Sequence, residues 1–371
     1  MRVGLLPALG GGLRELQQTG QQSRLIDGYF RPYVRAFGEI FYFSYLPESL
    51  AEFTQDRELL ERVRVLAPGS RMWRGRRAVG MTRAHAAEFR SCGMLRVFQI
   101  TGVIPVLIAN RRWGIPYVTT YGFSYGRLSR PGPKRVLKGF VERLGLKRAA
   151  AVIATTDELR ARAARFNPRV ELIPNGVDTA LFAPRPQAAS TRGPRRILYV
   201  GRLSPEKNLS TLVTATRYLG ADSMTMMVGP GPLRAELDAQ ARREGVVVEF
   251  PGVMDQRELP AVYQSADAFV LASFTEGHPK VLLEAMACGL PCVASNCAGN
   301  RSLIKDGETG LLFDPNSPEE LADCLKRVLS DDALADRLGR AGRALVESRY
   351  DLAGLVEREI ALVRSVGGAR G

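Results

Sequence analysis

Short apolar runs alternate with longer stretches of mixed polarity along most of the chain. A strand buried on both faces of a parallel sheet is almost continuously apolar, whereas a helix covering such a sheet is apolar on one face only. The alternation therefore predicts the α/β class, with parallel sheets covered by helices. The predicted strands form two series, Val3–Leu6, Ile40–Tyr45, Arg64–Leu66, Arg96–Gln99, Tyr117–Thr120, Ala151–Ala154 and Val170–Ile173, then Ile197–Val200, Met224–Val228, Val246–Phe250, Ala268–Leu271, Cys292–Ala294 and Leu311–Phe313.

Two series of strands predict two doubly wound, Rossmann-like domains with a cleft between them. The segment Ala183–Arg195 is typical of a linker, because it contains three prolines and small polar residues without periodicity. The predicted domains are therefore residues 1–182 and 196–349. The apolar spacing within residues 350–371 predicts a last helix that is able to pack back on the first domain. Other helices are clearest at Gln17–Phe37, Lys134–Leu144 and Asp157–Arg165.

Composition and charge narrow the class of protein. The 371 residues are 45% hydrophobic and 24% charged, which excludes a disordered, collagen-like or small disulfide-rich chain. The net charge of +14 is uneven, because residues 1–185 hold +16 and residues 186–371 hold −2. Such a basic half favours an anionic partner, either nucleic acid, a membrane surface or an acidic substrate. A compositional preference for arginine is the alternative interpretation.

Cysteine spacing and hydropathy bear on the compartment. The five cysteines include no Cys-x-x-Cys pair, so reduced buried thiols are favoured over a zinc site. The longest apolar stretch, Val97–Asn110, is shorter than the roughly 20 residues of a membrane-spanning helix. Pro7 and Gly10–Gly12 interrupt the N-terminus too early for a signal peptide. We expect a cytoplasmic protein, with peripheral contact at the inner face of the plasma membrane as an option.

Two cations follow the first strand of the second series. Arg202 and Lys207 lie in the loop after Val200, and a helix comes next. Ligands of open parallel sheets bind at the carboxyl ends of strands, and Arg and Lys together suit a diphosphate. Solvated loop cations are the alternative interpretation.

Two carboxylates follow a later strand of the same series. Glu276 lies in the loop after Ala272, and Pro279 is suited to begin a helix that contains Glu284. Helical side chains lean toward the N-terminus, so both carboxylates are able to approach one site and bind sugar hydroxyls. The amides of Gly277 and His278 favour a phosphate there. Glu284 could instead face solvent, but its apolar neighbours argue for a buried acid with a partner.

Other ligand-binding patterns are weak or missing in the sequence. The run Gly10–Gly12 and the pair around Gly229 and Gly231 do not complete a dinucleotide-binding fingerprint. A Walker-type Gly-Lys-Ser/Thr pattern and an Asp-x-Asp pair are also absent from the 371 residues. The sequence therefore predicts neither a resident cofactor nor a metal site.

These motifs together resemble the family-four retaining glycosyltransferases of the GT-B fold. The resemblance rests on the two cations after a strand and on the Glu-x7-Glu block Glu276–Glu284 with its Glu-Gly-His-Pro loop. Supporting motifs run in order along nearly the whole chain and match better in the second half. They are the glycines near Gly11, Ile173-Pro-Asn-Gly-Val-Asp178, Val228-Gly-Pro-Gly-Pro-Leu233 and Ala287-Cys-Gly-Leu-Pro291.

The resemblance implies that the second domain binds a nucleotide-sugar and the first domain binds the acceptor. It places Glu284 on the ribose and Arg202 with Lys207 on the diphosphate. Donor sugar and pyrophosphate would be held by Glu276 and the segment Gly277, His278, Pro279 and Lys280. Gly11 and Gly12 would approach the phosphates from the first domain, and Gly252 and Val253 would contact the base. We interpret Asn175-Gly176 as a turn beside the linker.

One departure from the family pattern concerns the first domain. Members commonly have a His followed by Gly after a first-domain strand, near the donor sugar. Here the strand reads Tyr117-Val-Thr-Thr-Tyr-Gly122, which places Tyr121 at that position as a candidate catalytic residue. A phenol with an ordinary pKa of about 10 keeps a hydrogen-bonding hydroxyl but is not a base at neutral pH. A Tyr packed at a strand end is the alternative interpretation.

The resemblance implies a retaining, metal-independent glycosyltransferase that moves a sugar from a nucleotide-sugar to an acceptor hydroxyl, in cell-surface glycan or glycolipid synthesis. A non-catalytic nucleotide-sugar-binding subunit remains an alternative, and a nucleic-acid partner, which rests on charge alone, is not expected. The basic surplus lies in the proposed acceptor domain, densest at Arg71–Arg83, with Trp73, and at Arg127–Arg148. This amphipathic, basic composition predicts a surface that contacts anionic lipid, and with it a lipid-linked or anionic glycan acceptor.

Overall fold

Two compact units make up the computed structural model, which describes residues 1–67, 74–122, 132–185 and 193–367. Unit 1 is Met1–Pro174 together with Ala353–Gly371, and unit 2 is Asn175–Leu352. The predicted linker falls mainly on residues 186–192, which lie outside the described residues. The residues that precede the predicted linker differ from our expectation. We assigned residues 1–182 to the first domain, but Val177 and Phe182 belong to the hydrophobic core of unit 2.

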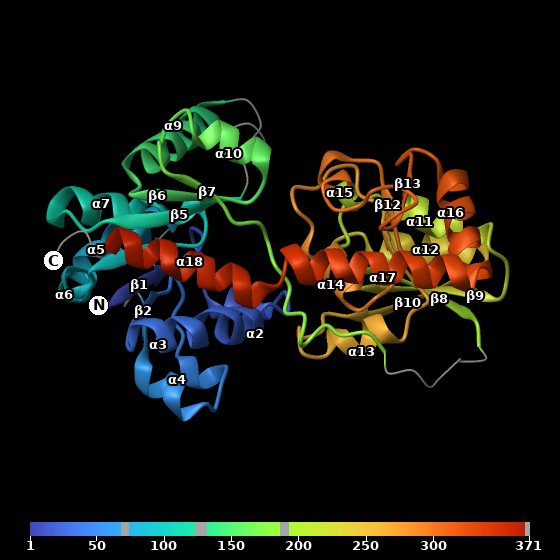
Figure 1. Cartoon of the computed structure of the whole chain (residues 1–371), viewed down its shortest axis with the longest axis horizontal. Helices are drawn as coiled ribbons and strands as arrows, with labels where there is room; N and C mark the ends of the chain where they lie inside the picture. The colour runs from blue at the N-terminus through green and yellow to red at the C-terminus, as the bar shows by residue number, and fades with distance from the viewer. Residues whose placement is uncertain (68–73, 123–131, 186–192, 368–371) are drawn as a thin grey trace. The chain divides into compact units, whose positions relative to one another are not determined.

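Unit 1 is built on a parallel sheet of seven strands (Figure 1) in the order β3-β2-β1-β4-β5-β6-β7. Every predicted strand of the first series is present. Pairing shifts some boundaries, because Val3 of β1 lies opposite Met94, so β4 begins and ends two residues earlier than predicted. The strands are β1 (Val3–Leu6), β2 (Ile40–Phe43), β3 (Val63–Leu66), β4 (Met94–Val97), β5 (Tyr117–Tyr121), β6 (Ala151–Ala154) and β7 (Val170–Leu172).

The helices of unit 1 follow the prediction with one break. The expected helix Gln17–Phe37 begins only at Gln22, because the preceding helix ends at Gln17 and Gly20 between them adopts φ +68°, a left-handed conformation. A π-helical turn at Ile26–Phe30 joins the next two helices into one continuous stretch. The α-helices are α1 (Leu13–Gln17), α2 (Gln22–Leu25), α3 (Arg31–Phe37), α4 (Arg57–Arg62), α5 (Arg74–Ala84), α6 (Ala86–Ser91), α7 (Ile104–Trp113), α9 (Pro133–Arg148), α10 (Asp157–Ala163) and α18 (Leu352–Gly367).

Unit 2 is a second parallel sheet, of six strands in the order β10-β9-β8-β11-β12-β13. Strand β8 lies between β9, the next strand in sequence, and β11, so the order reverses there. Ligands of doubly wound sheets bind at such a switch point, which places the search between the loops after β8 and β11. The strands are β8 (Arg195–Val200), β9 (Ser223–Val228), β10 (Val247–Gly252), β11 (Ala268–Leu271), β12 (Cys292–Ser295) and β13 (Leu311–Phe313).

Helices cover the second sheet and bury its apolar strands in one core. Helix α16 has an amphipathic pattern in which Leu321, Leu325 and Val328 are buried, and Ser317 caps its first turn. The two sheets, each with its own core, confirm the predicted α/β class and its two Rossmann-like domains. The helices of unit 2 are α11 (Leu209–Arg217), α12 (Arg234–Glu244), α13 (Leu259–Gln264), α14 (Lys280–Ala287), α15 (Ala298–Arg301), α16 (Pro318–Ser330) and α17 (Asp332–Arg349).

Helix α18 returns to unit 1 although it ends the chain. It lies among the strands and helices of the first half (red among blue and green in Figure 1) and buries Leu355, Ile360 and Leu362. Its Glu359 forms a buried ion pair with Arg96 of β4. Among the described helices, none combines the length and apolarity that crossing a membrane requires.

Candidate functional site

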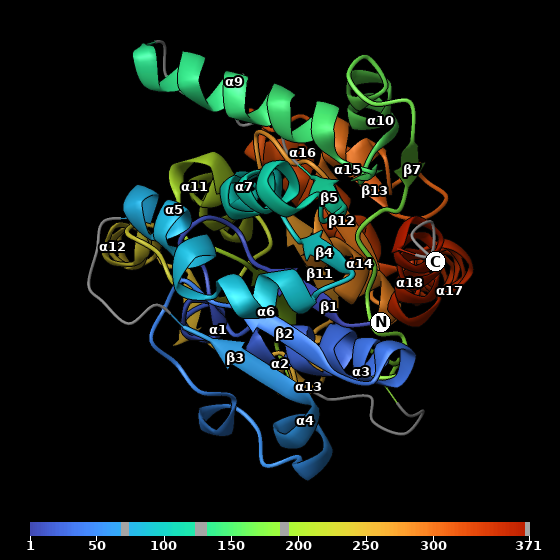
Figure 2. The same cartoon turned by 90° about the vertical axis from the view of Figure 1, so that its left-hand side faces the viewer.

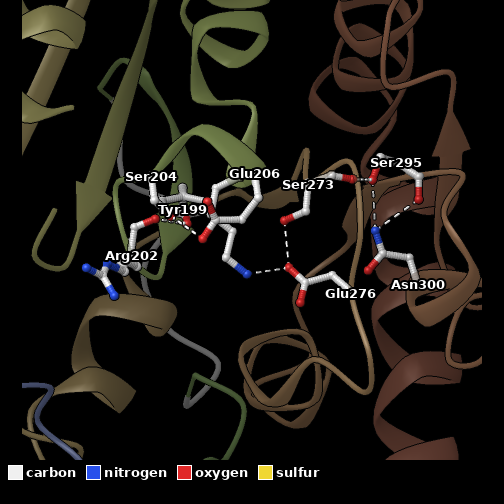
Figure 3. Close-up of polar contacts among 9 residues, drawn as sticks. Tyr199, Arg202, Ser204, Glu206, Ser273, Glu276, Ser295 and Asn300 are labelled. Atoms are coloured by element: carbon white, nitrogen blue, oxygen red, sulfur yellow. Dashed lines mark hydrogen bonds and ion pairs between the residues drawn. The ribbon is translucent and has the colours of Figure 1, made fainter. Parts of the chain in front are cut away.

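The loops after β8 and β11 meet at the carboxyl edge of the second sheet. Lys207 Nζ lies 2.6 Å from Glu276 Oε1, and the two side chains are 21% and 12% exposed. The amide of Phe274 donates to the carbonyl of Glu206 at 3.0 Å, which joins the two loops a second time. A cation and a carboxylate separated widely in sequence are thus held together at the switch point (Figure 3).

Glycines and an unusual asparagine shape the loop after β8. Gly201 has φ +152°, and a Cβ on Gly229 would lie 2.1 Å from the carbonyl of Gly201, so both positions require glycine. Asn208, at φ +54°, ends the short 3₁₀ turn that contains Lys207. Its side-chain amide donates to the carbonyl of Ala272 at 3.2 Å, which fixes the turn against β11. The local backbone therefore sets where Lys207 points.

Arg202 is exposed, and its guanidinium points away from the Glu276 carboxylate (Figure 3). Its carbonyl accepts a hydrogen bond from the Tyr199 hydroxyl at 2.9 Å, so the backbone is fixed while the side chain is presented to solvent. Glu206 is exposed, and the Ser204 hydroxyl donates to its Oε1 at 2.6 Å. This hydrogen bond is the main reason that the pKa of Glu206 is lowered.

Ser273, which the sequence analysis missed, completes the environment of Glu276. Its hydroxyl donates to Oε1 of Glu276 at 2.6 Å, and its carbonyl accepts from the Ser295 hydroxyl. A Cβ on Gly299 would lie 2.4 Å from the Glu276 carbonyl, so that backbone packs tightly on the start of α15. Ser273 follows β11 directly, and polar residues at that place are the signal that could have identified it.

Glu284 is buried in α14, as its apolar neighbours predicted. It is 1% exposed, and the Tyr263 hydroxyl of α13 donates to its Oε2 at 3.0 Å. Burial, and next the Glu284 charge, raises the pKa of Tyr263 well above its ordinary value, so the phenol remains a hydrogen-bond donor. Tyr263 is a second residue that the sequence did not identify.

The segment Gly277–Lys280 leads from the loop into α14. Pro279 occupies the N-cap position and α14 begins at Lys280, one residue later than predicted. Lys280 is exposed, whereas His278 is largely buried, and burial lowers the pKa of its imidazole to about 4. The ring is therefore neutral at physiological pH.

Gly252 and Val253 lie at the carboxyl end of β10, two strands from β8. The carbonyl of Gly252 accepts from the Gly229 amide at 2.8 Å, and Gly252 adopts φ +89°. The Val253 side chain is 43% exposed and presents an apolar surface beyond the strand. Contact of these residues with a nucleotide base stays a prediction.

The predicted site residues of unit 1 have contacts within that unit. Tyr121 is fully buried at the end of β5, and its hydroxyl donates to Glu142 of α9 at 2.8 Å. A Cβ on Gly12 would lie 2.6 Å from a carboxylate oxygen of Glu48, which accepts from the Leu13 amide at 2.8 Å. Gly11 packs close to Glu15. Contacts of Tyr121, Gly11 and Gly12 with a donor stay predictions.

Metal-ligating side chains do not gather in the part of the chain that the structure describes, where no group of three or more His, Cys, Asp or Glu could hold an ion. The five cysteines are unbridged thiols. Burial raises the pKa of Cys92 and of Cys288 to about 12, as expected of thiols in an apolar core.

Comparison with known families agrees with this geometry. Residues 183–345 match the family described as glycosyl transferases group 1, and residues 47–181 match glycosyltransferase family 4. The two matches together span most of the chain. The protein belongs to the family-four glycosyltransferases and has their GT-B fold.

Individual relatives align over part of their length. The chain is 31% identical to UDP-Gal:α-D-GlcNAc-diphosphoundecaprenol α-1,3-galactosyltransferase of Escherichia coli over 61% of this chain and 64% of that enzyme. It is also 31% identical to a GDP-mannose-dependent α-(1-6)-phosphatidylinositol monomannoside mannosyltransferase of Mycobacterium tuberculosis, over 62% and 65%. The aligned part thus spans less than two thirds of either relative. The HepE protein of Anabaena, in complex with UDP and glucose, superposes with a TM-score of 0.79 at 19% identity, over 98% of this chain and all of that one.

Proposed function

We propose that the protein transfers a sugar from a nucleotide diphosphate sugar to an acceptor hydroxyl with retention of anomeric configuration. The observation that carries the proposal is the Lys207–Glu276 pair at the switch point, beside the exposed Arg202. A paired cation and an exposed one at this edge suit a diphosphate, and the carboxylate suits sugar hydroxyls. The complexed UDP and glucose of HepE and the UDP-Gal and GDP-mannose donors of the relatives support a nucleotide-sugar.

Each group in unit 2 receives a role in binding this donor. Glu284, fixed by Tyr263, would accept hydrogen bonds from the ribose, and Val253 would pack on the base near Gly252. The amides of Gly277, His278 and Lys280 lie where the loop enters α14, so they would face the pyrophosphate. Arg202 would turn its forked guanidinium to the same group. By the family resemblance alone, Gly11, Gly12 and Tyr121 of unit 1 stay candidate contacts of the donor.

The proposed chemistry is a displacement on one face of the sugar. The bond from the anomeric carbon to the diphosphate oxygen breaks, and the acceptor oxygen bonds to that carbon on the same face. The acceptor proton passes to the departing diphosphate. Lys207, Arg202 and the amides at the start of α14 stabilise the charge on that leaving group, and Glu276 orients the sugar. These two cations take the place that a divalent metal has in other transferases.

A donor panel tests this function. Purified protein with UDP-, GDP- and ADP-sugars and a lipid diphosphate acceptor should release the nucleoside diphosphate of one donor, and EDTA should leave the rate unchanged. Glu284→Ala should weaken binding of that nucleotide about tenfold or more, because it removes two hydrogen bonds to a charged oxygen pair. The control Glu319→Ala removes an exposed carboxylate of the same unit and should bind normally. Tight donor binding without turnover would instead indicate a non-catalytic subunit.

We further propose that α9 contacts an anionic membrane surface and that the protein binds its acceptor there. Val136, Leu137 and Phe140 of α9 are 74%, 63% and 62% exposed. Figure 2 shows the N-terminal half of this helix projecting beyond the other elements of unit 1. Lipid-linked acceptors in the names of both relatives support this location. Residues 127–131 of the predicted basic stretch and residues 71–73 of the other lie outside the described residues.

The charges of α9 fit the same surface. Arg143 and Lys147 continue the stripe of Phe140 at spacings of three and four residues, and both are exposed. The opposite face of the helix buries Glu142 and Leu146. An apolar stripe that continues into lysine and arginine suits insertion among anionic headgroups.

Vesicle flotation tests the membrane proposal. Wild-type protein should float with phosphatidylglycerol-containing vesicles at low salt and much less with neutral ones. Replacing Val136, Leu137 and Phe140 together with serine should weaken binding at least about tenfold, because inserted apolar side chains contribute roughly 1 kcal/mol or more each. The control Val247→Ser changes an apolar side chain of unit 2 that is 57% exposed and should float normally. Equal flotation of all three proteins would exclude α9 as the contact.

A further inference from the structure

The chain enters and leaves unit 2 at two segments that lie side by side. Val177 and Asp351 form a parallel bridge, in which the Val177 amide donates to Tyr350 at 2.9 Å and the Leu352 amide donates to Val177 at 2.8 Å. The Thr179 hydroxyl adds a hydrogen bond of 2.6 Å to Asp351. We call residues 175–179 and 350–352 the crossover segments, since the boundaries of unit 2 fall at their ends.

Both crossover segments contact the donor loop, Phe274–Pro279, at one residue. The Asn175 side-chain amide donates to the His278 carbonyl at 2.9 Å. The His278 ring packs on the Tyr350 ring, with centroids 5.3 Å apart and planes inclined by 55°. One crossover segment therefore holds the backbone of His278, and the other holds its side chain.

His278 is suited to packing and not to carrying charge. Its Nδ1 is buried without a hydrogen-bond partner among the described residues, and its lowered pKa keeps the ring neutral. A neutral imidazole against a phenol contributes packing without an ionic partner. The ring thus packs between the donor loop and Tyr350.

The donor loop depends on such external contacts, because it belongs to neither a helix nor a strand. Its first half is fixed by the Ser273 and Lys207 bonds to Glu276. Its second half has to place the amides of Gly277 and Lys280 for a phosphate. The hydrogen bond from Asn175 restrains the peptide between these two amides.

We propose that Asn175 is a positioning residue that, with His278 and Tyr350, links the crossover segments to the donor loop. The link rests on the proposed function for its purpose, since it orders the loop amides toward the nucleotide. It gives Asn175-Gly176 a role beyond the simple turn expected from the sequence. By reciprocity, a nucleotide bound at the loop also stabilises the crossover segments.

Hydrogen exchange of three variants tests the link in the intact chain. Asn175→Ala and Asn175→Asp, which keeps the shape but loses the donor amide, should both speed exchange of the Phe274–Lys280 amides about five- to tenfold. Thr179→Val is the matched control, because it removes a crossover hydrogen bond that does not reach the loop. It should leave loop exchange unchanged. Unchanged loop exchange in both Asn175 variants, or an equal increase in Thr179→Val, would overturn the link.

Nucleotide binding supplies the second measurement. UDP or GDP should slow exchange of the Val177 and Leu352 amides in the wild type, and Asn175→Ala should raise the Kd of that nucleotide about fivefold with little change in Tm. An unchanged Kd together with an unchanged thermal midpoint would contradict the positioning role. Failure of the wild type to bind any of UDP, GDP and ADP would refute the proposed function, whereas the exchange result without nucleotide still decides the link.

Discussion

Lys207→Ala and Glu276→Ala should each reduce sugar transfer to near background, with kcat/KM about 100- to 1,000-fold lower, while the protein stays folded. Lys207 is expected to neutralise the leaving diphosphate, and removing one such preorganised group costs about 3–4 kcal/mol in the transition state. Loss of Glu276 frees Lys207 from its 2.6 Å partner and removes the carboxylate that orients the sugar. Steady-state rates with the donor identified by the panel provide the measurement.

Two matched substitutions separate this effect from general damage. Glu206→Gln changes the carboxylate next to Lys207, which is exposed and bound to Ser204, so it should keep nearly full activity. Lys305→Ala removes an exposed lysine that also has a carboxylate partner, Glu308 at 2.7 Å, and should be neutral. The loss of the Lys207–Glu276 pair itself should cost about 1–2 kcal/mol of unfolding free energy, because Ser273 still binds the carboxylate. Unchanged rates in Lys207→Ala would refute the assignment of the site.

The fold was predictable because buried parallel strands leave a strong signal. All thirteen strands of the two described sheets coincide with predicted apolar runs. The boundaries differ where pairing or backbone geometry decides, as at Met94, which pairs with Val3, and at Gly20, whose φ of +68° precedes the delayed start of a predicted helix. Local hydrophobicity predicts neither the pairing register of a strand nor the backbone conformation of a glycine.

The site was predictable only in part, because its contacts join distant residues. The loop position of Lys207 and Glu276 follows from the strands before them, but Tyr263 and Asn175 reach Glu284 and His278 from other elements. Tyr121 shows that a motif predicts the position of a residue in the chain but not the direction of its side chain. Its place at a strand end was correct, yet the direction of its hydroxyl depends on Glu142, a residue of α9 that the strand pattern does not include.

The buried ion pair between Glu359 of α18 and Arg96 of β4 was also not predicted from the sequence. Arg96 Nε and Nη2 donate to the two carboxylate oxygens of Glu359 at 2.8 Å each, and their side chains are 2% and 5% exposed. The Tyr33 hydroxyl adds a bond of 2.6 Å to Glu359, and Thr120 accepts from Arg96 at 2.7 Å. Since nearly every polar atom of the pair has a partner, the two charges tolerate burial.

Removing one member of this pair should be far more damaging than removing both. Glu359→Ala leaves the Arg96 charge buried without its counter-ion, and we expect a loss of about 3–5 kcal/mol in unfolding free energy. The double variant Arg96→Met with Glu359→Leu replaces both charges with apolar side chains of similar length and should recover most of that loss. Urea unfolding of the single and double variants measures the coupling. Arg364→Ala, a control on the exposed side of the same helix where Nη2 donates to the Ala36 carbonyl at 2.9 Å, should cost less than about 1 kcal/mol. If Glu359→Ala unfolds like that control, α18 is held by its apolar face alone, and the pair contributes nothing to its place on unit 1.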